Sequence, residues 1–115
     1  MLTKKELPEC PVATTVQLIG SKWKLLILRN LLQRPWRFNE LKKSLSGISQ
    51  KVLTDCLRSM EADGIITRTV YPEVPPRVEY ALSELGESMR QIIKAMETWG
   101  CNYKNQLQTY DKAAL

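Results

Sequence analysis

At 115 residues the chain has the length of one domain, and its 43% hydrophobic and 25% charged residues are ordinary for a globular protein. The formal net charge of +5 suits an anionic partner. The lack of histidine excludes histidine-based catalysis, and with three widely spaced cysteines it also leaves no ligand set for zinc. No apolar run reaches the roughly 20 residues of a membrane span and the N-terminus lacks a signal-peptide core, so we expect a cytoplasmic protein with no cofactor and no membrane contact.

The first two predicted helices lie within residues 10–35. Pro11 favours a helix start, because the first helical position does not need the amide hydrogen that proline lacks, and Cys10 then becomes the cap. Three apolar residues at helical spacing form the expected inner stripe of this helix: Val12, Val16 and Ile19. Ser21 caps a second helix over residues 22–33, which is apolar on most of its circumference. We therefore expect the second helix to be the central one of the domain.

Residues 36–64 form a predicted helix-turn-helix. Asn39 caps a short helix over residues 39–45, and a Ser-Gly pair at 46–47 breaks it before the next helix begins. Arg37 precedes the first of these helices, at a place where a phosphate contact is often made; a solvated surface charge is the alternative interpretation.

The second helix of this motif, within residues 49–64, is the segment around which the rest of the chain is organised. Ser49 caps its start, and Gly64 ends it in the left-handed conformation. Its apolar residues recur at helical spacing and predict one buried stripe: Val52, Leu53, Cys56, Leu57 and Met60. The opposite face carries groups of the kind that read base edges and bind phosphates: Gln50, Lys51, Thr54, Asp55 and Arg58. We predict a recognition helix.

Two strand-like runs, residues 65–71 and 77–82, predict a β-hairpin with one face on the core, because Val, Thr and Tyr recur at every second position. Pro75 and Pro76 stiffen the tip, and Arg77 follows at once. This arrangement suits insertion beside a phosphate or into a minor groove, with an ordinary exposed charge as the alternative. Helices followed by a hairpin make a winged helix. The predicted fold class is therefore mainly α with a small β-hairpin (α+β), in one domain whose wing is residues 65–82.

Residues 83–110 form a predicted dimerisation helix that begins at the Ser83 cap. Apolar residues at alternating steps of four and three form a coiled-coil-like seam: Leu85, Met89, Ile92, Met96, Trp99 and Tyr103. From residue 84 to residue 108 the helix is about 37 Å long at 1.5 Å per residue, too long for a domain of this size to cover. Burial against a second subunit is the economical solution. The alternative is a helix that packs wholly on its own domain.

Together these segments resemble the HxlR-type transcription regulators, a branch of the winged-helix regulators related to MarR. The resemblance rests on Cys10-Pro11-Val12 and on three longer segments, IGSKWKLLILRNLL (residues 19–32), RFNELKKSLSGISQKVLTDCLRSMEADGII (37–66) and YPEVPPRVEYALSELGESM (71–89). It implies a homodimer that binds operator DNA, with the recognition helix in the major groove and the hairpin as the wing. It also implies that a cysteine at the position of Cys10 is a thiol sensor in some members.

The expected function is sequence-specific binding of double-stranded DNA by a transcriptional regulator, with repression as the expected outcome. Two recognition helices about 34 Å apart suit an inverted repeat. The candidate base contacts are Gln50, Lys51 and Thr54, with Arg58 as a base or phosphate contact. The candidate backbone anchors are Arg37, Ser49 and Arg77. The alternative is a winged-helix module for protein interaction; an enzyme is not expected, because the carboxylates do not converge and no phosphate-cradling Gly loop is present.

Two cysteines are candidate redox-sensing residues. A helix N-terminus near Lys4 and Lys5 stabilises the Cys10 thiolate, and Cys101 on the dimerisation helix can reach Cys10 of the other subunit to form a disulfide. A cap residue of ordinary reactivity is the competing interpretation of Cys10, and Cys56 is expected in the core. A small-molecule or oxidant effector is a further candidate partner. Three aromatic residues are candidates for the lining of a dimer crevice that would bind it: Trp23, Trp99 and Tyr103.

Overall fold

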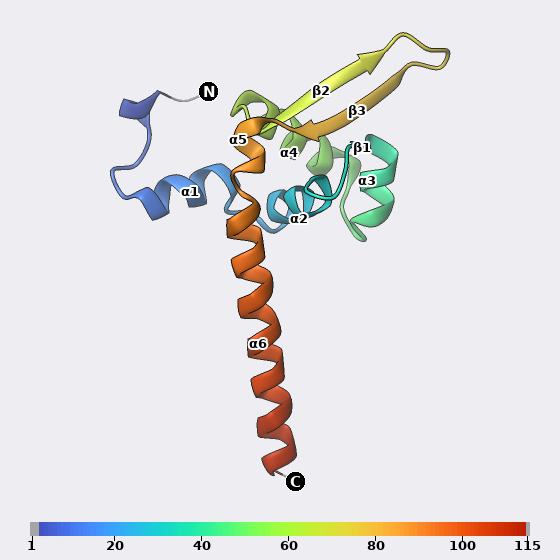
Figure 1. The fold of residues 1–115 in the computed structure, drawn as a ribbon. Coiled ribbons are helices and arrows are strands. Elements are labelled where there is room, and N and C mark those ends of the chain that lie inside the picture. The colour runs from blue at the N-terminus through green and yellow to red at the C-terminus, as the bar shows by residue number, and fades with distance from the viewer. Residues whose placement is uncertain (1–2, 115) are drawn as a thin grey trace.

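The computed structural model describes the backbone of residues 3–114 and the side chains of residues 3–107. It has the predicted α+β class: a winged helix-turn-helix from which one long helix projects (Figure 1). After a single 3₁₀ turn at Lys4–Glu6, the helices are α1 (Pro11–Ile19), α2 (Lys22–Leu31), α3 (Phe38–Ser44), α4 (Gln50–Ala62), α5 (Glu84–Glu87) and α6 (Arg90–Ala114). The strands are β1 (Trp36–Arg37), β2 (Ile66–Tyr71) and β3 (Arg77–Leu82). Within the described residues, no helix has both the length and the apolar character that crossing a bilayer requires.

Serine side chains begin three helices at the predicted caps. The hydroxyl oxygens of Ser21, Ser49 and Ser83 each accept a hydrogen bond from the amide three residues on, at 3.1 Å. Beyond the end of α4, Gly64 has a φ of 76°, a left-handed conformation that glycine adopts at little cost. Local chemistry therefore sets both ends of α4, as predicted.

The helices α2 and α3 differ from their predicted bounds. α2 ends at Leu31 rather than at residue 33. α3 begins at Phe38 with Arg37 as its cap, so the predicted Asn39 cap is wrong. The reason is that Glu40 Oε1 accepts a hydrogen bond from the Arg37 amide at 2.8 Å and satisfies the backbone at the helix start. The same bond lowers the pKa of the Glu40 carboxyl, and the Arg34 side chain adds to the effect.

The wing belongs to a three-stranded antiparallel sheet in the order β1-β3-β2. In this sheet Tyr80 of β3 is paired with Arg68 of β2 and with Trp36 of β1. We expected residues 36–37 to be a connector, but they pair with the otherwise free edge of β3. A strand of two residues has no periodicity, so the sequence pattern does not reveal it.

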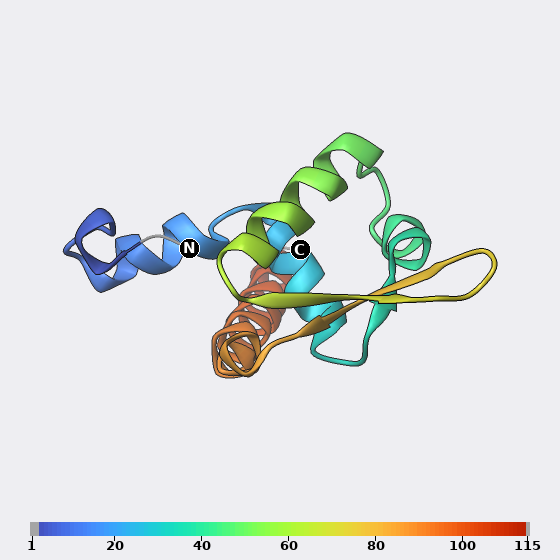
Figure 2. The same ribbon diagram turned by 90° about the horizontal axis from the view of Figure 1, so that it is seen from above.

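Only the base of the hairpin reaches the core. Ile66 is buried, whereas Val70 and Val74 are exposed toward the tip. The prediction of one face on the core is correct at the base and wrong for the outer half. Figure 2 shows why: the hairpin extends past α3, beyond the helices that could cover it.

The core lies where α2, α4, the base of the sheet and the first turn of α6 meet. Of the predicted stripe of α4, Leu53, Leu57 and Met60 are buried and Cys56 is half-buried. Val52 is 37% exposed, so its place in the stripe is wrong. The other fully buried side chains are Ile27, Leu28, Leu41, Leu45 and Ile65. Because α2 lies in the middle of this set, it is the central helix, as predicted.

Side-chain hydrogen bonds fix the elements around α2. The buried Asn30 donates from Nδ2 to Ser44 Oγ at 3.0 Å, at the end of α3. Trp36 Nε1 donates to the Asn30 carbonyl oxygen at 2.8 Å, and Lys24 Nζ donates to Ser59 Oγ of α4 at 2.9 Å. Each of α3, β1 and α4 is therefore bound to α2 by a polar contact as well as by packing.

The first helix, α1, leads away from the domain (Figures 1 and 2). Its last residue, Ile19, joins the core, but Val12 is 71% exposed and Val16 is also exposed. The predicted inner stripe is therefore wrong for Val12 and Val16 within a single chain, because no element of the described chain covers that part of α1.

The last helix is not continuous as predicted, because the short α5 precedes α6. Ser83 Oγ donates to the Ile65 carbonyl at 2.9 Å, and Gly86 lies so close to the same carbonyl that a Cβ there would collide with it. This tight contact holds α5 against the turn between α4 and β2, and Met89, which follows α5, is buried in the core.

Candidate nucleic-acid interface

The N-terminal half of α4 presents polar side chains to solvent. Ser49, Gln50 and Lys51 are exposed, and the Ser49 hydroxyl is also the helix cap. Lys51 Nζ lies 3.5 Å from Asp55 Oδ2, in a pair that leaves the Lys51 side chain 87% exposed. Exposed ion pairs of this kind contribute little to stability, so their charged groups can exchange partners readily. The Lys51 ammonium is therefore available to a phosphate or a base edge.

Thr54 and Arg58 line a hollow of about 290 Å³ between α4 and the sheet. The other residues of this α4–wing hollow are Phe38, Leu57, Glu61, Arg68 and Tyr80. The predicted DNA-facing side of α4 thus has two parts. Lys51 and Asp55 are on the outer part, and Thr54 and Arg58 are on the part that faces the wing.

Arg68 and Tyr80 were not among the predicted contacts. They are cross-strand partners, so their side chains lie on the same face of the sheet. Arg68 Nε lies 3.5 Å from Glu61 Oε1. Burial raises the pKa of the Tyr80 phenol, against the opposing effect of Arg68, so the phenol stays protonated and can donate. The only feature of the sequence that could have indicated these two residues is the alternation within the hairpin, which places Arg68 on the same face as Ile66.

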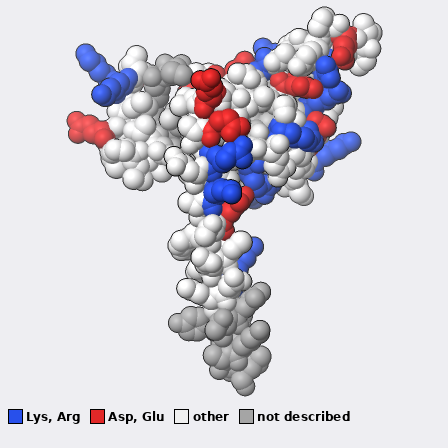
Figure 3. Space-filling model, viewed as in Figure 1, with Lys and Arg blue, Asp and Glu red and all other residues white. Residues whose placement is uncertain are grey.

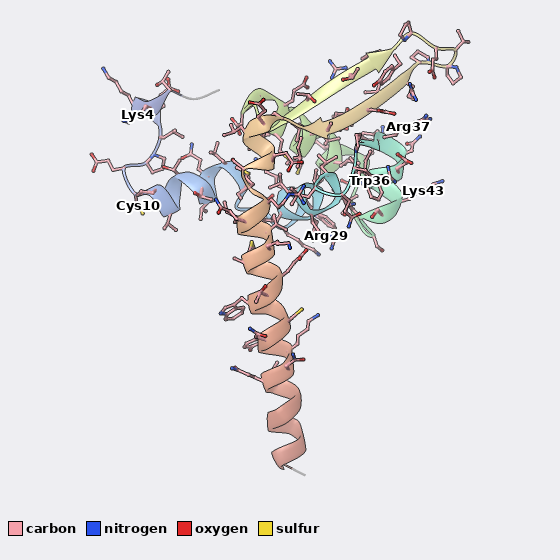
Figure 4. The ribbon with its side chains drawn as sticks, viewed as in Figure 1. Lys4, Cys10, Arg29, Trp36, Arg37 and Lys43 are labelled. Atoms are coloured by element: carbon pink, nitrogen blue, oxygen red, sulfur yellow. The ribbon has the colours of Figure 1, made fainter. Side chains whose placement is uncertain are left out.

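Arg37 and Arg77 border a second, more open groove between α3 and the wing tip. Arg37 is exposed, and Figure 4 places it at the edge of the domain, near the start of α3. Figure 3 shows further basic side chains on this α3 side of the domain, below the wing. The surroundings of Arg37 are thus compatible with the predicted phosphate contact.

Arg77 is held within the wing itself. Its guanidinium nitrogens lie 3.3 Å from Glu73 Oε1 and 3.5 Å from Glu79 Oε1, and its guanidinium carbon is 4.0 Å from the centroid of the Tyr71 ring. Only 28% of the side chain is exposed. A DNA contact by Arg77 therefore remains a prediction that requires the side chain to exchange a carboxylate for a phosphate.

The projecting part of α6 carries exposed apolar side chains. Trp99 is 68% exposed and stacks on Tyr103, with ring centroids 5.3 Å apart. A hollow of about 590 Å³ lies on this surface, lined by Gln91, Ile92, Ala95, Met96 and Trp99. Figure 3 shows that the described surface here is largely uncharged.

The predicted seam is divided by the break before α6. Leu85 is exposed but belongs to α5, and Met89, which we expected on the seam, is buried in the core of its own domain. Of the predicted six residues, those on α6 are Ile92, Met96, Trp99 and Tyr103. Trp23, a candidate for an effector crevice, is half-buried against the core instead.

All three cysteines are free. Cys10 precedes α1 and is exposed, and Cys101 is exposed on α6. Because α1 and the outer part of α6 point in different directions (Figure 1), one chain does not bring the two thiols into a common site. Burial raises the pKa of the half-buried Cys56, against the effect of Lys24. In the described part of the chain, no three Cys, Asp or Glu side chains are grouped to hold a metal ion.

Comparison with known proteins shows that the chain is similar to one helix-turn-helix family and to several known regulators. The model of the HxlR-like helix-turn-helix family matches residues 18–108. The uncharacterized HTH-type transcriptional regulator YdeP of Bacillus subtilis (strain 168) is 44% identical over 104 residues, 90% of this chain and 81% of that protein. The redox regulator HypR in its reduced form has a TM-score of 0.81 and 40% identity, covering 88% of this chain and 100% of that chain. The reduced form of the transcriptional regulator YodB from B. subtilis has a TM-score of 0.70 and 34% identity, covering 80% of this chain and 91% of that chain.

Proposed function

The chain belongs to the HxlR-like helix-turn-helix family of transcriptional regulators, and on that premise we propose that it is a homodimer that binds an inverted-repeat operator in double-stranded DNA and represses transcription. The observation that carries this proposal is the polar, exposed N-terminal half of α4 beside a projecting wing. A helix about 10–12 Å across fits a major groove about 12 Å wide. Regulators of this class act by binding rather than by catalysis, so no catalytic residue is assigned.

Gln50 and Lys51 are the proposed base contacts. The Gln50 amide can pair with adenine and the Lys51 ammonium with guanine in the major groove. Thr54 and Arg58 follow on the side of α4 that faces the wing. The proposed backbone anchors are Arg37, Ser49 and Arg77. Arg77 must first release Glu73 or Glu79.

The proposed dimer uses α6 and α1. Exposed apolar side chains gathered on one surface mark a protein contact, and Trp99 and Tyr103 form such a surface on α6. Val12 and Val16 offer a second copy a further apolar contact on α1. To meet successive major grooves, the two α4 helices must lie about 34 Å apart.

We further propose that Cys10 senses oxidants and that Cys101 of the second copy is its partner. The likeness to HypR, a redox regulator, supports this, as does the exposure of both thiols. On oxidation the two thiols lose two electrons and two protons to the oxidant, and one S–S bond forms. Diamide should release the wild-type protein from DNA but leave the Cys10→Ser variant bound. A Cys56→Ser control should behave as wild type, and release of the Cys10→Ser variant by diamide contradicts the sensor role.

Selection of binding sites from random-sequence duplexes tests the proposed function. We expect enrichment of an inverted repeat, a footprint over both halves, and binding that weakens steeply with salt. Gln50→Ala should relax the preference at one position in each half-site, at a cost of about 1–3 kcal/mol. If Lys51→Ala and Arg77→Ala both leave the affinity intact, the assigned face is wrong. If no sequence is enriched, a protein-interaction module with α6 as its docking surface is the better interpretation.

A further inference from the structure

The α4–wing hollow lies between the two elements that DNA binding would place in neighbouring grooves. Its walls come from α4, β2 and β3, with Phe38 at the start of α3 closing one side. Figure 2 shows α4 and the wing diverging from a common base at this place.

Duplex geometry determines what must fit in the space between α4 and the wing. The major groove and the adjacent minor groove are separated by the sugar-phosphate backbone of one strand. A protein with a helix in one groove and a hairpin in the next therefore straddles that backbone. We propose, on the basis of the function proposed above, that the α4–wing hollow seats one phosphodiester group of this strand, bound by Arg58 and Arg68 with help from the hydroxyl groups of Thr54 and Tyr80.

The charges around the hollow favour an anion. Two guanidinium groups, Arg58 and Arg68, face one carboxylate, Glu61, so the formal charge of the lining is positive. Arg68 contacts Glu61 through Nε at 3.5 Å, and 46% of its side chain is exposed. A guanidinium has five N–H donors, and a single contact leaves the others for a phosphate.

The remaining groups suit a small polar ligand. Tyr80 and Thr54 are both half-buried, and each can donate a hydroxyl hydrogen to a phosphate oxygen. A volume of about 290 Å³ is at the lower limit of pockets that hold small organic ligands, roughly 300–1,000 Å³. A phosphodiester group entering from the open side needs less room than such a ligand.

This inference gives the wing a phosphate contact that the sequence analysis did not identify. Arg77, the expected wing contact, is bound by Glu73 and Glu79 on the opposite face of the sheet from Arg68. Within the described side chains, Arg68 is ion-paired with one carboxylate, that of Glu61. Arg68 therefore reaches a phosphate with less rearrangement than Arg77.

Neutral methylphosphonate groups, placed one at a time in a duplex chosen by the random-sequence selection, test the hollow directly. The wild-type protein should lose about tenfold in affinity when the phosphate between the α4 bases and the flanking minor groove is neutralised. Arg68→Ala removes one of the two guanidinium groups at both half-sites of the proposed dimer, so it should lose at least about tenfold on the unmodified duplex. The further loss from that methylphosphonate should fall well below roughly tenfold, because only Arg58 remains to bind the phosphate. Tyr80→Phe keeps the ring and its packing and should give a smaller loss at the same phosphate.

Glu61→Gln separates phosphate binding from a purely structural role. If Arg68 and Glu61 only brace α4 against the wing, Arg68→Ala and Glu61→Gln both weaken binding. If the hollow binds phosphate, Glu61→Gln removes a competing carboxylate and strengthens binding about threefold. Lys94→Ala is the control for Arg68→Ala: it removes one positive charge from an exposed position on α6 and should leave the methylphosphonate profile unchanged.

The outcomes distinguish this inference from the proposed function. A tenfold methylphosphonate effect that persists in Arg68→Ala, or weaker binding by Glu61→Gln, overturns the hollow alone. Failure of the wild-type protein to bind any selected duplex overturns the proposed function, and the hollow with it.

Discussion

α4 and α6 are both amphipathic helices, but only α4 is covered by its own chain. Three apolar residues of α4, Leu53, Leu57 and Met60, are buried, although Val52 is exposed. On α6 the burial stops at Ile93, and Trp99 further along the helix is exposed. The difference shows that helical periodicity identifies an apolar face without identifying what covers it. α4 is covered by α2 and the sheet, whereas no element of the described chain covers the outer part of α6, where we propose that a second copy binds.

The largest expected effect is on the covered helix. Leu53→Ala should lower the free energy of unfolding by about 3 kcal/mol, because it leaves a cavity in a core where Leu53 has no exposed surface. Urea denaturation at a fixed protein concentration measures the loss. The matched control is Val74→Ala, at the fully exposed wing tip, which should change little. Equal costs for the two variants would contradict the assigned core.

On the uncovered helix, truncation should affect association rather than folding. Trp99→Ala should raise the dimer dissociation constant by about thirtyfold, because a large exposed aromatic side chain on α6 is a candidate hot spot. Sedimentation equilibrium measures the change, with Lys94→Ala as the control. A wild-type chain that is monomeric at every concentration, or a Trp99→Ala variant with unaltered association, contradicts the dimer surface.

A smaller effect is expected where α4 begins, since a single local hydrogen bond fixes that end. Ser49→Ala should cost about 1 kcal/mol, because the Val52 amide loses its acceptor. Ser49→Asp supplies another acceptor and should restore most of the stability. Thermal unfolding of the two variants beside Ser46→Ala, in the preceding turn, measures the difference. A loss shared by Ser46→Ala would show that the effect is not specific to the cap.

Glu40 gives the smallest expected effect, at the start of α3. Its pKa is lowered in the folded state by the hydrogen bond from the Arg37 amide. A lowered folded-state pKa adds stability above the ordinary value of 4.5, and this contribution is lost as pH falls through the folded value. Glu40→Gln keeps an acceptor but cannot ionise, so its stability should fall less between about pH 6 and pH 3. An unchanged acid dependence of the urea midpoint would contradict this role.

The sequence predicted the elements whose ends are set by nearby residues. The caps at Ser21, Ser49 and Ser83 depend on an amide three residues away, and β3 has the predicted bounds. The pairing of β1 with β3 joins residues more than 40 positions apart, so no local pattern indicated it. The break before α6 was missed for a related reason, because it depends on Gly86 packing against the Ile65 carbonyl.

For the candidate site, the sequence indicated the helix but not the division of its polar side. Thr54 and Arg58 were expected to face DNA with Lys51, and the structure places them in a hollow shared with Arg68 and Tyr80. Spacing along a helix determines the direction in which each side chain points. Which element faces that side chain depends on the pairing of β2 with β3 and on the packing of these strands against α4.

By itself, the sequence determined a winged helix-turn-helix with a capped recognition helix and a long apolar-faced helix at its end. Caps, turns and helical spacing act within a few residues, and the chain encodes them directly. Only the tertiary structure decided that Met89 is buried while Trp99 is exposed, that Arg77 is bound within the wing, and that Arg68 faces α4. These outcomes depend on contacts between distant segments, where sheet register and the shape of the core determine which side chains meet.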